Sequence, residues 1–118
     1  LIKYLIGATT NNNPNEWRKF IQDYSKLAKQ EKEKFGYHFM LLKVWYQSTN
    51  RLQKNLDDPL HNTPLESGMK RFISKYPSVD ILSIIVELEE TVRAISMNLY
   101  MPLVLTNLLL KTQKYLKQ

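Results

Sequence analysis

Apolar residues recur at i, i+3, i+4 and i+7 along most of this chain, which is the spacing that places them on one face of an α-helix. Prolines, asparagines and charged clusters interrupt the pattern and mark the ends of separate elements. The pattern predicts five helices, at residues 14–29, 31–54, 64–76, 78–98 and 102–115. The sequence therefore predicts an all-α fold, a single helical bundle of about five helices.

Two of these helices begin with capping signals. Asn13 can accept a hydrogen bond from the first turn, Pro14 suits the first helical position, and Glu16 stands where a capping box places its carboxylate. Residues 63–66 (Thr-Pro-Leu-Glu) repeat this arrangement at the end of a loop over residues 55–63. Both signals favour a helix that starts close to these positions.

The first thirteen residues are expected to lie outside the bundle. Residues 1–6 are apolar but too short to stand alone, so we expect an edge piece or the end of a helix that began upstream. Residues 7–13 (Gly-Ala-Thr-Thr-Asn-Asn-Asn) favour turns and predict a linker. The chain begins at Leu1 without an initiator Met, as an excised fragment would. We thus expect residues 1–13 to end a preceding segment and residues 14–118 to form the helical domain.

The helix expected at residues 31–54 is apolar over most of its circumference. Such a helix lies at the centre of a bundle or is shared between the core and a partner. Trp45 and Tyr46 are its candidate interface residues, because tryptophan and tyrosine are enriched at protein interfaces. Gly36 is unfavourable inside a helix, so it marks a close crossing of helices or a ragged helix start.

The two closing helices carry most of the aliphatic residues. In the helix at residues 78–98, Asp80, Glu87 and Thr91 are expected opposite the stripe that faces the core. That stripe consists of Ile81, Ile84, Ile85, Leu88, Val92, Ile95 and Leu99.

The last helix has one core face, and Leu103 and Leu110 lie on its other side. Two leucines outside the core face are either covered by another helix or exposed to a partner, so both are interface candidates. Tyr100, in the joint at residues 98–102, is a third candidate. Pro102 must end one helix or open the next.

Composition and charge narrow the function classes. The 118 residues are 43% hydrophobic and 24% charged, as in a globular domain, and the absence of cysteine excludes disulfides, thiolate metal sites and cysteine nucleophiles. No apolar run approaches the roughly 18 residues of a membrane span. The net charge is +6, and residues 1–54 hold ten Lys/Arg against four Asp/Glu. A basic half can meet nucleic acid or an acidic partner, although scattered helix lysines more often form a solvated surface.

Candidate catalytic and metal-binding residues form no constellation. His38 and His61 are far apart in sequence, and a metal site needs further ligands at suitable spacing. The carboxylates of Asp57 and Asp58 and those of residues 87–90 fit a loop and a solvated helix face better than acid–base catalysis. The sequence has no glycine-rich phosphate loop and no nucleophile or zinc motif. We therefore expect no catalytic, cofactor or metal site in this chain.

The aromatic residues leave a second function class open. Aromatic side chains with lysines between them can stack on nucleic-acid bases, but most of these residues lie on core-facing lines, which favours packing. They are Trp17, Tyr24, Tyr37, Trp45, Tyr46 and Tyr100. The alternative hypothesis is a basic helical bundle that binds nucleic acid, of the kind associated with primases or transcription factors.

Two stretches of the chain resemble one family. Residues 17–48, which include KFIQDYSKLAKQEKEKFGYHFMLLKVWYQS, resemble the helix pair that opens the C-terminal domain of bacterial clamp-loader delta-prime subunits. Residues 72–116 (FISKYPSVDILSIIVELEETVRAISMNLYMPLVLTNLLLKTQKYL) resemble the end of that domain, with an Ile/Leu-rich helix, an Asn-to-Pro joint and a Leu-rich last helix. Asn98 and Pro102 match the family's joint, whereas the three residues between them lengthen it. The resemblance covers about two thirds of the chain.

The resemblance implies a collar domain of the bacterial DNA polymerase III holoenzyme. In that family, the helical C-terminal domains of five subunits form a ring, and the AAA+ modules that precede them load the sliding clamp during DNA replication. The family's nucleotide-sensing residues lie upstream, so none falls on this chain. The implied partners are the other clamp-loader subunits, with DNA reached only through the complex and with no membrane or small-molecule substrate. The implied location is cytoplasmic.

Overall fold

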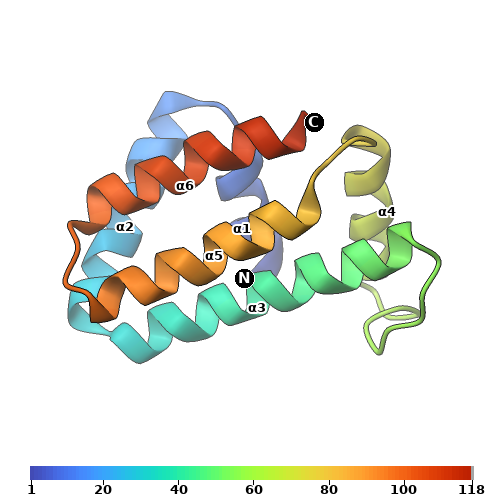
Figure 1. Ribbon diagram of the computed structural model, residues 1–118, viewed down its shortest axis with the longest axis horizontal. Coiled ribbons are helices and arrows are strands. Elements are labelled where there is room, and N and C mark those ends of the chain that lie inside the picture. The colour runs from blue at the N-terminus through green and yellow to red at the C-terminus, as the bar shows by residue number, and fades with distance from the viewer. Residues whose placement is uncertain (118) are drawn as a thin grey trace.

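The computed structural model describes residues 1–117, and in this range it contains six α-helices and no strand (Figure 1). The all-α prediction is confirmed, with one helix more than the five expected. The helices are α1 (Ile2–Thr10), α2 (Pro14–Gln30), α3 (Lys32–Gln53), α4 (Glu66–Lys75), α5 (Ile81–Ser96) and α6 (Met101–Leu116).

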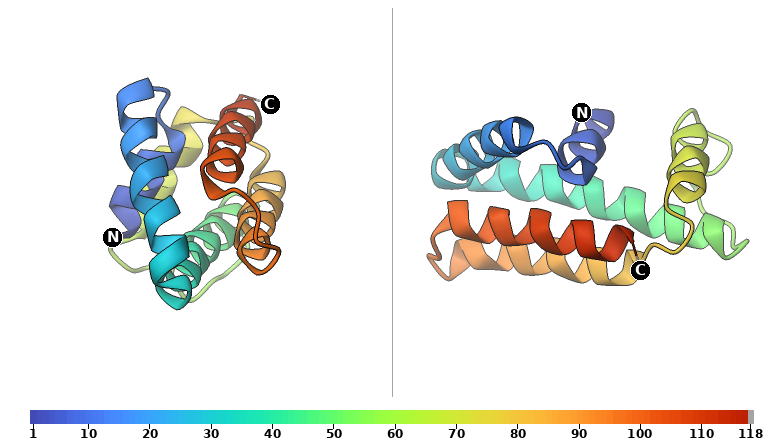
Figure 2. Two further views of the ribbon diagram at one scale, coloured as in Figure 1. Left: turned by 90° about the vertical axis from the view of Figure 1, so that its left-hand side faces the viewer. Right: turned by 90° about the horizontal axis from the view of Figure 1, so that it is seen from above.

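Four long helices build the body of the bundle. Helices α5 and α6 form an antiparallel hairpin, α3 lies along α5, and α2 packs on both α3 and α6 (Figures 1 and 2). The short helix α1 packs against α2, α3 and α6, and α4 packs on the last turns of α3 at the far end from the α5–α6 joint. The result is an elongated molecule of 39 × 26 × 21 Å.

Aromatic rings join α2 to α3 in the core. Tyr24 stacks on Phe20 at a centroid distance of 4.7 Å, and Phe35 stacks on Phe39 at 4.3 Å. The Tyr24 ring meets Phe35 and Phe39 edge-on, both at 6.0 Å. Edge-to-face and offset contacts of this kind add to the free energy gained from burial, so the α2–α3 pair has a specific packing partner for each ring.

The cap predicted at Asn13 is confirmed, whereas the one predicted at residues 63–66 is wrong, because α4 begins at Glu66 with Leu65 at its N-cap and no side-chain cap hydrogen bond. The Asn13 side chain accepts a hydrogen bond from the Asn15 N–H, 2.9 Å, and caps α2. Asp80 caps α5 by accepting from the Ser83 N–H at 3.1 Å, which shortens the expected helix at its start. Pro102 lies in the first turn of α6, so it opens this helix rather than ending α5.

The linker expected at residues 7–13 is wrong for its first four residues, because α1 continues to Thr10. The Thr9 and Thr10 hydroxyls donate to the carbonyls one turn earlier, at 2.7 and 2.6 Å, and so remain satisfied inside the helix. Leu5 is fully buried in the common core, and the Gln113 side chain donates to the carbonyl of Thr10 at 2.7 Å. Residues 1–13 therefore pack as part of the bundle and not as a separate segment.

Two assignments on α5 are also corrected. Thr91, expected opposite the core, is buried. Its hydroxyl donates to the Glu87 carbonyl at 2.8 Å, so burial leaves this polar group with a hydrogen-bond partner. Leu99, expected in the core stripe, is exposed, because α5 ends at Ser96 and the chain turns away before this residue. The other six members of the stripe are buried or packed against the core.

Replacing Gly36 with alanine is expected to raise the free energy of unfolding by about 1 kcal/mol. Gly36 lies inside α3, and a methyl group built on it meets no atom within 4 Å, so the close crossing considered for this position is absent. Alanine loses less conformational entropy on folding. Thermal unfolding followed by circular dichroism should show a midpoint about 4 °C higher. A lower midpoint would mean that α3 needs the glycine.

Candidate functional site

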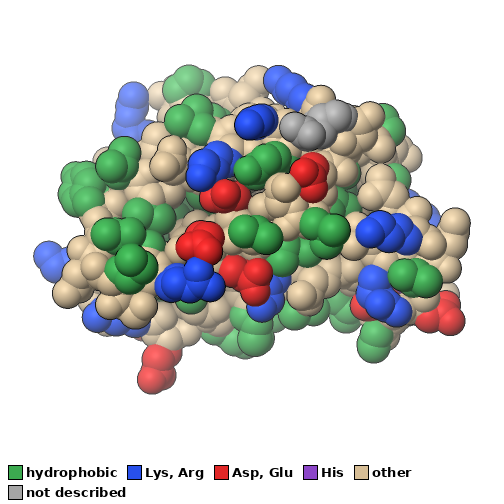
Figure 3. All heavy atoms as spheres, viewed as in Figure 1, with side chains coloured by type: hydrophobic (Ala, Val, Ile, Leu, Met, Phe, Trp, Pro, Cys, Tyr) green, Lys and Arg blue, Asp and Glu red, His purple; other side chains and the backbone are tan. Residues whose placement is uncertain are grey.

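Seven exposed large apolar side chains, including the three most exposed of the described residues, lie on the α5–α6 hairpin. This group, called here the hairpin surface, consists of Leu82, Val86, Met97, Leu99, Tyr100, Leu103 and Leu110. Each of them is about half exposed or more. In Figure 3, hydrophobic side chains form separate groups on the face of this hairpin, with acidic and basic side chains between them, and a larger group lies at the end that holds the joint. Single apolar residues are normal on a protein surface, but seven of them on one hairpin, four of which lie at residues 97–103 around its joint, make this hairpin the candidate interaction site.

A defined backbone turn presents the joint of this hairpin. Asn98 adopts the left-handed conformation, with φ of 54°. The Leu99 N–H donates to the Ala94 carbonyl and the Asn98 N–H to the Ile95 carbonyl, both at 3.2 Å, which is the Schellman arrangement. The turn directs the chain away from α5, so Leu99 and Tyr100 remain on the outside of the bundle.

Three of the five predicted interface residues belong to the hairpin surface. Tyr100 is 73% exposed, Leu103 64% and Leu110 54%. The alternative that another helix covers the two leucines is therefore excluded within the described chain. Their helical periodicity identified the two leucines, because it places them outside the core face of α6. Their role in an interface stays a prediction.

The other two predicted interface residues are buried within the chain. Trp45 is 3% exposed and Tyr46 1%, because α4 lies across this part of α3. Phe72 of α4 meets both rings edge-on, at 5.4 Å from Trp45 and 5.6 Å from Tyr46. Burial raises the pKa of the Tyr46 hydroxyl, so this group stays protonated in the core. Both side chains stabilise the packing of α4, and only about 3% of the Trp45 surface and 1% of the Tyr46 surface remains exposed.

The sequence analysis did not identify several members of the hairpin surface as interface candidates. Leu82 and Val86 are one turn apart on α5 and 55% and 52% exposed, outside the stripe that faces the core. Their i, i+4 spacing was the available signal. Ion pairs border them: Lys111 lies 3.5 Å from Glu87, and Lys43 lies 3.6 Å from Glu89. These charges give the surface a polar edge, as the rims of interfaces have.

A groove opens between the joint of the hairpin and the α2–α3 turn. Its volume is about 820 Å³, and Tyr100 on one side faces Lys26, Lys29 and Lys32 on the other. These lysines are exposed and form no ion pair among residues 1–117. The groove thus combines an exposed aromatic ring with positive charge, as do the grooves of proteins that bind single-stranded nucleic acid.

A comparison with family models, curated proteins and solved structures finds no match for this chain. Within residues 1–117, no three His, Cys, Asp or Glu side chains gather closely enough to hold a metal ion. In the same range, none of the helices combines the length and the hydropathy that crossing a bilayer requires.

The two histidines have structural partners. The Nδ1 atom of His38 lies 2.8 Å from the Tyr24 hydroxyl, and Nε2 of His61 lies 3.0 Å from the Ser48 carbonyl oxygen. Burial raises the pKa of Tyr24 to about 12, so its hydroxyl remains a donor near neutral pH. In the α3–α4 loop, Asp58 accepts hydrogen bonds from the Leu60 N–H at 2.9 Å and from the Ser48 hydroxyl at 2.8 Å. The Leu60 contact is the main cause that lowers the pKa of Asp58.

Acidification is expected to destabilise the fold through His38. Burial first, then the charges of Lys34 and the amino terminus, hold the pKa of His38 below its ordinary value of 6.5. Above 6.5 the imidazole is neutral in both states. Below it the unfolded chain takes up the proton first, so stability falls until the folded pKa is passed. Urea unfolding at about pH 7 and pH 5 should show a smaller loss for His38→Gln than for the wild type. An equal loss of stability in the variant and the wild type would show that titratable groups other than His38 cause the pH dependence.

Proposed function

We propose that this chain is an assembly module: the helical collar domain of a clamp-loader subunit of the delta-prime type, in bacterial chromosomal DNA replication. Its task is to associate with the helical domains of other clamp-loader subunits. The AAA+ modules connected to those domains are then held in a ring that can load the sliding clamp. The proposed location is the cytoplasm, where the polymerase III holoenzyme acts.

The hairpin surface is the observation that carries this proposal. An isolated domain gains no stability from apolar side chains left in water, whereas a subunit buries them against its neighbours. Leu103 and Tyr100 are among the most exposed apolar residues of the described chain, and both lie at the joint for which the family resemblance was drawn. The ion-paired edge formed by Glu87 and Lys111 fits the polar rim of an interface.

The test is reconstitution of the complex. The chain is co-expressed with the other clamp-loader subunits encoded in the same genome, and a stable complex should elute in size-exclusion chromatography with a mass, from light scattering, that includes one or more of them. An assembly interface of this class buries about 1,200 Å² or more in total. If the chain elutes alone at every subunit combination, the collar assignment fails.

The groove beside Tyr100 favours one second candidate, binding of single-stranded nucleic acid. Lys26, Lys29 and Lys32 would contact phosphates while a base stacks on the exposed ring. Fluorescence anisotropy with labelled oligonucleotides at several salt concentrations separates the two functions. Micromolar binding that weakens steeply with salt, and that is lost in Tyr100→Ala, would favour this candidate over the collar.

A further inference from the structure

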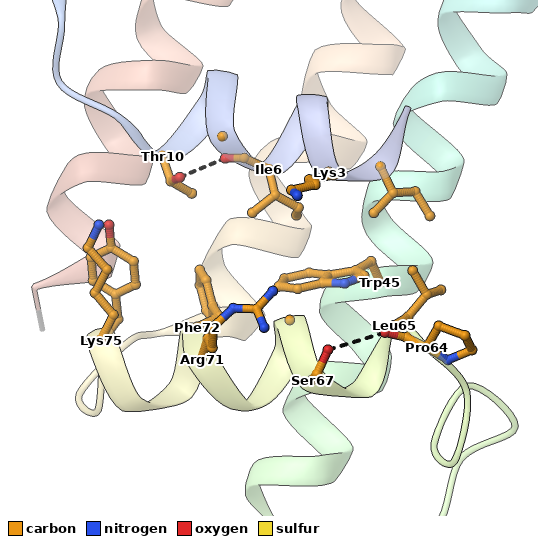
Figure 4. A pocket seen from close by; sticks show the side chains of 14 residues that line it. Lys3, Ile6, Thr10, Trp45, Pro64, Leu65, Ser67, Arg71, Phe72 and Lys75 are labelled. Atoms are coloured by element: carbon orange, nitrogen blue, oxygen red, sulfur yellow. Dashed lines mark hydrogen bonds between the residues drawn. The ribbon is translucent and has the colours of Figure 1, made fainter.

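A second groove lies on a different part of the molecule, between α1 and α4. Both helices rest on α3, and the space between them forms an open groove of about 520 Å³ (Figure 4). Its floor is apolar and is formed by Trp45 and Phe72, with Ile6 and Leu65 at its sides. The volume lies in the range of natural binding pockets. The groove shares no residue with the hairpin surface or with the groove beside Tyr100.

The rim of this α1–α4 groove is uniformly positive. Lys3 of α1 and Arg71 of α4 extend into the space between the helices, and Lys75 extends from α4 at one end (Figure 4). None of the three forms an ion pair among residues 1–117, in contrast to Lys70 on the same helix, which lies 4.0 Å from Glu66. No aspartate or glutamate lines the groove. Three cations without carboxylates above an apolar floor are complementary to a ligand that is both acidic and apolar.

We propose that the α1–α4 groove binds an acidic peptide segment of a partner protein. A leucine or aromatic side chain of the peptide packs between Ile6 and Leu65, which are more exposed than the floor, and its carboxylates face Lys3, Arg71 and Lys75. Arg71 can bind a carboxylate with two parallel hydrogen bonds, whereas the lysines contribute charge and steer the encounter. Nucleic acid fits less well, because Trp45 is 3% exposed and offers no open ring face for a base. This contact adds a peptide partner to the proposed assembly role and does not depend on it.

Two glycines allow the groove to be blocked without removing a contact. Gly7 of α1 and Gly68 of α4 both line it. A methyl group built on Gly68 lies 3.7 Å from the Nη2 atom of Arg71, and one built on Gly7 meets no atom within 4 Å. Leucine at position 68 therefore projects beside the guanidinium, where the peptide would lie, and leucine favours a helix over glycine.

The test begins with a library of random peptides displayed on phage and selected against the immobilised 118-residue chain. Enriched peptides should be acidic and should carry a leucine or aromatic residue. Their synthetic forms are then measured by fluorescence anisotropy. Arg71→Glu with Lys75→Glu should weaken binding about tenfold or more, because the peptide's carboxylates then meet like charge. Gly68→Leu should also abolish or strongly weaken binding.

Two control variants locate the effect. Gly36→Ala, a glycine replacement outside the groove, should bind the peptides as the wild type does. Leu103→Glu with Leu110→Glu should also leave peptide binding unchanged, so that a failure of this proposal and a failure of the assembly proposal are distinguishable. Circular dichroism of each variant verifies that the helices are retained.

Several outcomes would overturn the proposal. They are a selection that enriches no peptide or only neutral or basic ones, and binding that survives both Gly68→Leu and the charge reversal. Binding of phosphatidylglycerol vesicles that is lost with the charge reversal and competes with the peptide would assign the groove to a lipid headgroup. Light scattering that shows self-association of the wild type, but not of Gly68→Leu, would assign it to a second copy of the chain.

Discussion

Replacing Trp45 with alanine is expected to lower the free energy of unfolding by about 4 kcal/mol. The side chain is 3% exposed and meets Tyr46 and Phe72 edge-on, with ring centroids at 5.2 and 5.4 Å. Its removal opens a cavity where α3 and α4 meet and takes away the floor of the α1–α4 groove. Because small domains are stable by only about 5–15 kcal/mol, this loss is a large fraction of the total. Urea unfolding followed by circular dichroism measures it.

Tyr100→Ala is the matched control for this variant. Tyr100 is also aromatic but is 73% exposed, so its replacement should change the stability by less than about 0.5 kcal/mol. The opposite result, with a stable Trp45→Ala and a damaged Tyr100→Ala, would mean that α4 does not cover α3 as described. The comparison thus tests the burial of Trp45 independently of any partner.

The hydrophobic pattern predicts which residues share a face of a helix, but it does not show what covers that face. For α3, the pattern correctly predicts a helix that is apolar on most sides. It cannot show that Phe72 of α4, more than twenty residues further along the chain, packs against Trp45 and Tyr46. Leu103 and Leu110 were easier to place, because they lie outside the face of α6 that is buried against the other helices. Burial by a distant helix is tertiary information that the periodicity of one helix lacks.

Helix α1 was predicted only in part, as one of two alternatives for residues 1–6, for a related reason. Glycine, threonine and asparagine disfavour helices, so residues 7–13 predict turns. In the fold, Leu5 is buried in the common core, and the Gln113 side chain donates to the carbonyls of Thr10 and Asn11, at 2.7 and 2.9 Å. These contacts span about a hundred residues of sequence, and they stabilise a helix whose local propensity is weak. By contrast, α2 and α5 carry their own caps in Asn13 and Asp80, and their existence was predictable.

The candidate functional residues also fall into those that the sequence could identify and those that only the fold brings together. Its residues on α6 depart from a clear core face, so the sequence identifies them. The grooves cannot be predicted from the sequence, because each is lined by segments that are distant along the chain. Lys29 and Tyr100 meet at one end of the bundle, and Lys3 and Arg71 meet across α3. Only the packing of α1, α2 and α4 on the central helices places these side chains together.

If the chain has the proposed collar function, replacing Leu103 and Leu110 together with glutamate is expected to weaken association with its partner subunits by roughly a hundredfold, or about 3 kcal/mol. Both side chains are more than half exposed, so the variant should keep the helical content and stability of the wild type. In an assembled interface, however, two carboxylates would have to be buried without partners, which is costly. Co-purification and the dissociation constant from surface plasmon resonance measure the loss, and circular dichroism verifies the fold.

The choice of control decides what this double variant means. Asn107 is exposed on the same side of α6, between the two leucines in sequence, and Asn107→Glu adds a carboxylate there without removing apolar surface. If apolar contact through Leu103 and Leu110 drives assembly, Asn107→Glu should retain most of the affinity. An equal loss in both variants would instead indicate that any negative charge on α6 repels the partner. Unfolding of the double variant in isolation would show that the leucines stabilise the chain itself. The proposal that the hairpin surface is an interface would then fail.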